Sequence, residues 1–227
     1  IAKFAHLHFA SSNEACKRLL SIGEEKKRIF LTGAPQLIDI KPNKVNNFLS
    51  NYFIIIFHPV LNEIESVRKQ TINLIDSIKQ FKNYEFKWIF PNNDMGHNII
   101  LTELKKTKIA NLKIIKNLER NEFIRMLSNS RGIIGNSSCG IIEASMFPIP
   151  VVNIGSRQNG RPQSKNILNT NYDSKNIIKN IKKITNVKNV QKLLKKIKNP
   201  YYKKNSNYKI FDLIYKFKKD NLIFKKF

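Results

Sequence analysis

The sequence predicts a doubly wound α/β fold, in which helices cover both faces of a parallel sheet. Short apolar runs typical of buried strands alternate with amphipathic helix patterns along most of the chain. The run from Tyr52 to Phe57 is almost entirely apolar, as expected for a strand buried on both faces of a parallel sheet. Polar segments follow strand after strand, and the carboxyl ends of parallel strands are where such folds bind ligands.

The beginning of the chain predicts a single β-α-β unit. Strands are expected from Phe4 to Phe9 and from Arg28 to Thr32. Between them Ser11 and Glu14 fit a capping box, and Gly23 is placed to end the helix. This unit of about 30 residues is the building block of a parallel sheet.

The polar, irregular stretch from Pro35 to Asn51 indicates a domain boundary, after which the alternation of strands and helices resumes. Asn62 and Glu65 are placed to cap the first helix of this second part. Further strands are expected at 52–57, 86–90, 112–115, around 133–134 and at 150–154, and helices at about 64–81, 99–106 and 122–129.

The segment after Arg161 reads as helical and strongly basic. Amphipathic stripes predict helices around Ile181 and Leu194, and Asn199-Pro200 interrupts the pattern. A last helix is expected to turn Phe211 and Ile214 inward. The lysines opposite these stripes are most simply solvated faces.

The stretch from Arg131 to Gly140, R-G-I-I-G-N-S-S-C-G, predicts an anion site. Ile133 and Ile134 form a short buried strand, a polar turn follows, and a helix is expected from Gly140. The first N–H groups of a helix are unpaired and its dipole is positive there, so neighbouring serine hydroxyls would complete a phosphate site. Taken alone, the same residues are equally explained as plain helix caps.

The formal net charge is +25, with 41 Lys and Arg against 16 Asp and Glu. Such a charge suggests nucleic acid or an anionic membrane, but the basic residues are mostly Lys interspersed with Asn and Ile. We therefore expect no specific nucleic-acid partner. We also expect no membrane association, because no run of 18 apolar residues occurs. Cys16 and Cys139 match no metal spacing, so we expect free thiols, no metal and no cofactor.

Four motifs, in their order and spacing, resemble the UDP-N-acetylglucosamine 2-epimerase family. The resemblance extends from about Phe4 to Leu168 and is strongest to the hydrolysing branch, which makes N-acetylmannosamine and UDP for sialic-acid synthesis. Related enzymes use GDP-linked sugars for legionaminic acid. The motifs are F-H-P-V at 57–60, P-N-N-D-M-G at 91–96, G-N-S-S-C-G-I-I-E at 135–143 and N-I-G-S-R-Q-N-G-R at 153–161.

The resemblance implies a GT-B-like architecture of two Rossmann-like domains with the sugar nucleotide between them. Residues 1–34 would be the end of the first domain, residues 35–199 the complete nucleotide-holding domain, and residues 200–227 a basic C-terminal helix. The family's acidic catalytic residues lie in the missing first domain, so we expect this chain alone to turn over little or nothing. A cytoplasmic location and a homo-oligomer are also expected.

The resemblance also implies a substrate site of seven residues, although each has a plain structural explanation as well. His58 matches a histidine that contacts the diphosphate and is also the one candidate in this chain for participation in catalysis, and Ser137 and Ser138 match phosphate-binding serines. Glu143 matches the carboxylate that takes the ribose hydroxyls. The other three are Asn92, which matches a nucleotide contact, Leu118, whose backbone would meet the base, and Arg157, which would lie near the nucleotide.

Several alternatives remain open on the sequence alone. The base could be uracil or guanine, because base contacts in the family are partly made by the backbone. The chain could instead be a non-catalytic nucleotide-binding module, or a basic nucleic-acid binder with steeply salt-dependent affinity. His97-Asn98 stands where animal members have Ser-Lys leading into a feedback site for CMP-sialic acid, so that regulation is not expected here.

Overall fold

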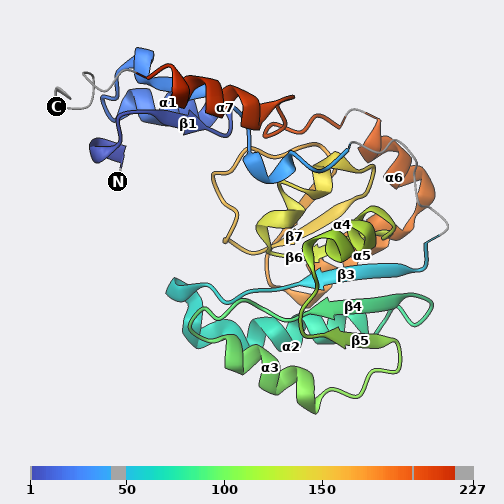
Figure 1. The fold of residues 1–227 in the computed structure, drawn as a ribbon. Helices are drawn as coiled ribbons and strands as arrows, with labels where there is room; N and C mark the ends of the chain where they lie inside the picture. Colours follow the sequence, from blue (N-terminus) through green and yellow to red (C-terminus); the bar gives the residue numbers. More distant parts are fainter. Residues whose placement is uncertain (1, 42–49, 196, 218–227) are drawn as a thin grey trace. The chain divides into compact units, whose positions relative to one another are not determined.

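The computed structural model describes residues 2–41, 50–195 and 197–217, and the chain forms two compact units (Figure 1). We call Ile1–Lys41 with Asn199–Phe227 unit 1, and Pro42–Lys198 unit 2. No helix among the described residues is long and apolar enough to cross a membrane.

Unit 2 is built on a six-stranded sheet in the order β5-β4-β3-β6-β7-β8, and every pair is parallel. This confirms the predicted doubly wound parallel sheet. The chain moves outward from β3 in one direction through β4 and β5, then returns to β6 on the other side of β3. The switch point between β3 and β6 is where open α/β sheets bind their ligands. The strands are β3 (Tyr52–Ile56), β4 (Glu85–Ile89), β5 (Leu112–Ile115), β6 (Gly132–Gly135), β7 (Val151–Ile154) and β8 (Ile167–Thr170).

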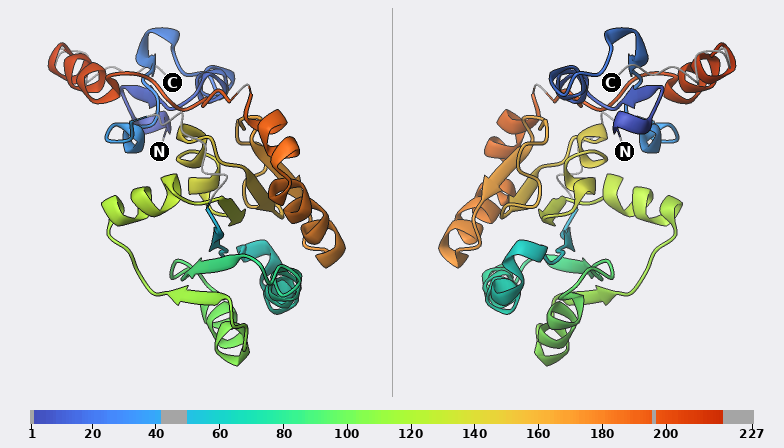
Figure 2. Two further views of the ribbon diagram at one scale, coloured as in Figure 1. Left: turned by 90° about the vertical axis from the view of Figure 1, so that its right-hand side faces the viewer. Right: turned by 90° about the vertical axis from the view of Figure 1, so that its left-hand side faces the viewer.

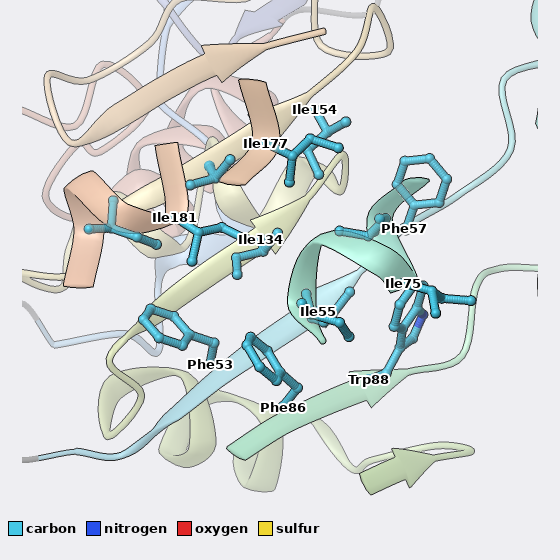
Figure 3. Close-up of a cluster of buried hydrophobic side chains, with 14 of the residues drawn as sticks. Phe53, Ile55, Phe57, Ile75, Phe86, Trp88, Ile134, Ile154, Ile177 and Ile181 are labelled. Carbon is cyan, nitrogen blue, oxygen red and sulfur yellow. The ribbon is translucent and has the colours of Figure 1, made fainter. Parts of the chain in front are cut away.

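The apolar run of β3 forms the middle of the core, as its sequence predicted. Phe53, Ile55 and Phe57 are 0% exposed and belong to one cluster with side chains from the neighbouring strands and helices (Figure 3). Phe53 packs against Phe86 of β4 with ring centroids 6.0 Å apart. The edge strand β8 was not predicted, because only two of its four residues are apolar.

Helices cover both faces of this sheet, with α2 and α5 on one side and α4 on the other (Figure 2). The helix expected at about 64–81 forms as α2 in its central part, and its residues Val67, Thr71 and Ile78 are all 0% exposed. The helices of unit 2 are α2 (Val67–Ile78), α3 (His97–Lys106), α4 (Arg120–Ser128), α5 (Ser174–Thr185) and α6 (Val187–Leu194).

Two helix starts predicted in unit 2 are wrong. Asn62 caps no α-helix, because Leu61–Ser66 forms a 3₁₀-helix, η4, and α2 begins only at Val67. The helix expected from Gly140 is replaced by two single turns of 3₁₀-helix, η5 (Ser138–Gly140) and η6 (Ala144–Met146). The segment is almost fully buried, Glu143 and Ser145 included, so no exposed polar face distinguishes an α-helical repeat in its sequence.

Unit 1 contains the predicted β-α-β arrangement in shortened form. Its two parallel strands are three residues each, and the first begins at His8 rather than Phe4, because Ala2–Phe4 forms a 3₁₀-turn, η1. Ser12, not Ser11, caps the helix by accepting from the Ala15 amide at 3.2 Å. The elements are β1 (His8–Ala10), α1 (Asn13–Ser21), η2 (Lys26–Arg28), β2 (Ile29–Leu31), η3 (Pro35–Leu37) and α7 (Ser206–Tyr215).

The C-terminal segment is part of unit 1. The Ala34 amide donates to the Tyr201 carbonyl at 2.9 Å, and Lys209 Nζ of α7 donates to the Leu31 carbonyl at 3.0 Å. The inward orientation predicted for Phe211 and Ile214 is wrong, since their side chains are 65% and 55% exposed.

Candidate functional site

The candidate site lies at the carboxyl edge of the unit 2 sheet. Because all six strands are parallel, the segments that follow them emerge at one edge. His58 follows β3 and Ser137 follows β6, so these two residues flank the switch point. Asn92 follows β4 and Arg157 follows β7.

Asn136 joins the ends of β3 and β6. Its Oδ1 accepts from the His58 amide at 2.7 Å, and its Nδ2 donates to the His58 carbonyl at 2.8 Å. The two strands approach each other closely here, since a Cβ on Gly135 would lie 2.0 Å from the Ile56 carbonyl oxygen. Gly135 has φ 135°, a conformation that other residues rarely adopt.

The His58 imidazole is held as a neutral hydrogen-bond donor. Its Nδ1 accepts from the Asn92 amide at 3.1 Å, so the proton of the neutral ring resides on Nε2. Partial burial, and secondarily the Arg157 charge, lower the pKa of His58 to about 4, against smaller opposing effects of Asp94 and Asn92. At neutral pH the ring therefore offers an N–H group without a positive charge.

Arg157 brings a positive charge to this edge, and Arg161 is near enough that its charge acts on the Arg157 guanidinium. Its Nη2 lies 3.8 Å from Asp94 Oδ2, and its Nη1 donates to the Asn136 carbonyl at 3.4 Å. Burial lowers the pKa of Arg157, but a guanidinium stays protonated at neutral pH. Asp94 also accepts from Asn92 Nδ2 at 2.6 Å. The structure thus brings His58, Asn92 and Arg157 into one network.

The loop after β6 also carries Ser138. Its hydroxyl is partly exposed and has no hydrogen-bond partner among the described residues, whereas its carbonyl accepts from the amides of residues 141 and 142. Ser137 makes no side-chain cap and instead contacts the Cys139 thiol. The plain capping explanation for these serines therefore fails. The argument from an α-helix dipole fails as well, because η5 is a single turn.

Cys139 and Glu143 are buried residues close to the serines, and the Cys139 thiol contacts Ser137. The Glu143 side chain is 7% exposed, and the two groups are close enough that its charge adds to the burial that raises the pKa of Cys139 to about 12. The thiol is consequently protonated and unreactive at neutral pH.

A second polar cluster holds the loop that carries Arg157. Ser156 Oγ donates to Glu63, and Gln70 Nε2 donates to the same carboxylate at 2.9 Å. Burial alone would raise the pKa of Glu63, but hydrogen bonds from Ser156, Tyr172 and Gln70 lower it overall. Burial and the bond to Glu63 raise the pKa of Tyr172 to about 12. Glu63 is thus a satisfied carboxylate that fixes the loop after β7.

Leu118 takes no part in these interactions within the described chain. Its amide donates to the side chain of the preceding Asn117 at 2.9 Å, in the loop after β5. The same described residues contain no group of three or more His, Cys, Asp or Glu side chains that could hold a metal ion.

The sequence assigned no site role to Asn136, Gln158 or Glu63. Gln158 Nε2 donates to the Asn136 carbonyl at 2.7 Å and is 1% exposed as a residue. Asn136 and Gln158 fall inside two of the four motifs, and that position is the signal by which they could have been found.

Comparison with known proteins places the chain in a family. The profile described as UDP-N-acetylglucosamine 2-epimerase matches residues 1–215, so the chain belongs to this family of nucleotide-sugar epimerases. It is 36% identical over 188 residues to the UDP-N,N'-diacetylbacillosamine 2-epimerase (hydrolyzing) of Legionella pneumophila, with 77% of this chain and 50% of the relative covered. It is 30% identical to the UDP-N-acetylglucosamine 2-epimerase of Neisseria meningitidis, covering 78% and 49%. The chain spans about half the length of these relatives.

Solved structures confirm the GT-B-like fold. The Neisseria meningitidis UDP-GlcNAc 2-epimerase bound to UDP-GlcNAc matches with a TM-score of 0.75 at 17% identity, over 95% of this chain and 62% of that one. The S. aureus MnaA–UDP structure matches with a TM-score of 0.74 at 20% identity, over 99% and 62%. At these identities the likeness concerns the fold.

Proposed function

We propose that this chain is the nucleotide-binding half of a hydrolysing UDP-N-acetylglucosamine 2-epimerase, which makes N-acetylmannosamine and UDP for sialic-acid-type synthesis. The observation that supports this most strongly is that Asn136 joins His58 and Arg157 in one network at the carboxyl edge of the sheet, with Ser138 two residues further along the chain. An N–H donor, a cation and a hydroxyl together suit a diphosphate.

Within this proposal the diphosphate meets the Nε2–H group of His58 and the guanidinium of Arg157. Ser137 and Ser138 bind phosphate oxygens, and Glu143 takes the ribose hydroxyls. Asn92 contacts the nucleotide, and the Leu118 backbone meets the base. To contact the base, the Leu118 N–H group would have to give up its hydrogen bond to the Asn117 side chain. Alternatively, the Leu118 carbonyl would accept from the base.

The epimerase chemistry needs more than this chain supplies. In the proposed reaction a base removes the proton on C2 of the sugar as UDP departs, which gives a glycal to which water then adds. A proton on carbon requires a carboxylate held close to it and tuned for the transfer. Glu63 is held by Ser156, Tyr172 and Gln70, and Glu143 is already assigned to the ribose, so we assign the base and acid to a preceding Rossmann-like domain of which residues 1–34 are the end. A cytoplasmic homo-oligomer completes the proposal.

Calorimetry of the 227-residue chain with UDP and with GDP tests the site. Arg157→Ala is expected to weaken UDP binding by roughly tenfold or more, because it removes a charge-assisted hydrogen bond. Ser138→Ala should weaken it by less. The matched controls are Arg68→Ala, an arginine whose side chain is 63% exposed, and Ser128→Ala on α4. Equal binding by the wild type, both site variants and both controls would remove the assigned site. Tighter binding of GDP would assign the chain to the GDP-sugar enzymes.

A further inference from the structure

Asn136 forms hydrogen bonds with both His58 and Arg157, the two residues assigned to the diphosphate, but is itself fully buried. It is 0% exposed and directly follows β6 at the switch point. Its side-chain amide satisfies both backbone polar groups of His58, at 2.7 Å and 2.8 Å. This reciprocal pair fixes the backbone of His58 relative to β6, and the Asn92 amide then holds its ring at Nδ1.

The backbone of the same residue holds the segment after β7. The Asn136 carbonyl accepts from Gln158 Nε2 at 2.7 Å and from Arg157 Nη1 at 3.4 Å. One residue therefore bonds to segments that follow β3 and β7, on either side of its own strand. The His58 imidazole and the Arg157 guanidinium are the two groups whose relative placement it sets.

We propose that Asn136 is a positioning residue that places His58 and Arg157 so that both bind one nucleoside diphosphate. This inference rests on the proposed function. Two donors can share one diphosphate only if they are spaced to match it, and a displacement of about 1 Å is enough to lose such a contact. Removing the Asn136 side chain takes away the partners of the part-buried His58 amide and carbonyl, so this segment must shift to pair them again.

The test compares Asn136→Ala with Asn166→Ala in the full 227-residue chain. Asn166 is also 0% exposed and also donates to a backbone carbonyl, that of Ile149 at 2.8 Å, but it lies at the opposite, amino-terminal edge of the sheet just before β8. We expect both variants to lower the melting temperature. Only Asn136→Ala should weaken binding of UDP and of inorganic pyrophosphate, by roughly tenfold or more, whereas Asn166→Ala should stay within about twofold of the wild type.

Equal affinities of the two variants for UDP would overturn the positioning role. Loss of UDP and GDP binding by the wild type itself would instead overturn the proposed function, and the positioning role with it, so the two failures are distinguishable. If Asn136→Ala does not fold, Gln158→Leu removes one donor to the same carbonyl. A fewfold loss of pyrophosphate affinity is expected for Gln158→Leu, and unchanged affinity would contradict the link to the segment after β7.

Nuclear magnetic resonance of the His58 ring supplies a readout that general destabilisation does not move. In the wild type the neutral Nε2–H tautomer should persist to low pH, and His58→Gln identifies its signals. In Asn136→Ala the ring should titrate closer to the ordinary pKa of a histidine, because it is no longer held in place. Signals and titration identical to those of the wild type would contradict the proposal.

Discussion

Units 1 and 2 are both α/β, but they differ in how completely they bury their apolar residues. Unit 2 has six parallel strands with Phe53, Ile55 and Trp88 at 0% exposure. Unit 1 has two strands of three residues, and its helix α7 leaves Phe211 and Tyr215 65% and 81% exposed. In its described part the buried apolar side chains are Ala10, Ala34, Leu37, Ile40 and Tyr201.

This difference shows why the candidate site is formed by unit 2. A two-stranded sheet is marginally stable in water, whereas a sheet covered on both faces holds the segments that follow its strands in fixed positions. The two units can also be followed separately. Trp88 is the single tryptophan of the chain and lies in the core of unit 2, so its fluorescence reports the unfolding of that unit alone.

The largest expected effect compares Phe53→Ala with Phe211→Ala. Phe53 is fully buried between Tyr84 and Phe86, with ring centroids 5.3 Å and 6.0 Å away, so its removal leaves a cavity. We expect the free energy of unfolding of unit 2 to fall by about 3–5 kcal/mol. Phe211→Ala should change the stability of the chain by no more than about 0.5 kcal/mol. Urea unfolding followed by Trp88 fluorescence and by circular dichroism measures both.

A comparable loss in both variants would contradict the contrast between the units, because it would mean that the exposed face of α7 is packed in solution. Tyr84→Phe serves as a further control in the same core, since it keeps the ring next to Phe53.

The next effect compares Gly135→Ala in unit 2 with Gly23→Ala in unit 1. Both glycines have positive φ, 135° and 84°, so both substitutions incur backbone strain of about 1–2 kcal/mol. In unit 2 the new Cβ also meets the Ile56 backbone at 2.0 Å, whereas in unit 1 the nearest atom is the end of the flexible Lys3 side chain at 3.5 Å. Gly135→Ala should therefore lower stability more than Gly23→Ala and also weaken UDP binding. Equal losses of stability in thermal unfolding, with unchanged UDP binding by Gly135→Ala in calorimetry, would mean that the approach of β3 and β6 is unimportant.

Much of the fold could be predicted because the patterns that specify it are local. The apolar run of β3 and the stripe of α2 each indicate buried faces without any knowledge of their partners. The sequence of α7 also has an apolar face, which includes Phe211 and Ile214, but this face is exposed. Whether an apolar helix face is covered depends on segments elsewhere in the structure. The same limit applies to β8, whose half-polar sequence is specified by its pairing with β7.

The candidate site was predictable to a smaller extent. The motifs pointed to His58, Ser138 and Arg157, and their positions after parallel strands implied that they meet at one edge. The sequence could not show that Asn136 pairs with the His58 backbone, because an asparagine after a strand is usually only a turn residue. Hydrogen bonds between residues 78 positions apart depend on the register of β3 and β6, which no local pattern encodes.

The smallest expected effect is the dependence of unit 2 stability on the protonation of His58. The pKa of His58 is lowered from 6.5 to about 4 in the folded chain. The unfolded chain therefore binds more protons between these values, and stability is lost as the pH falls from about 6.5 towards 4. Because the ring is partly exposed, we discount the shift and expect a loss of about 1–2 kcal/mol.

His58→Gln removes this group, so Trp88-detected unfolding of the variant should lack this part of the pH dependence. If the free energy of unfolding depends on pH in the same way in the variant and the wild type, another group causes the dependence, and His58 is an ordinary solvated histidine.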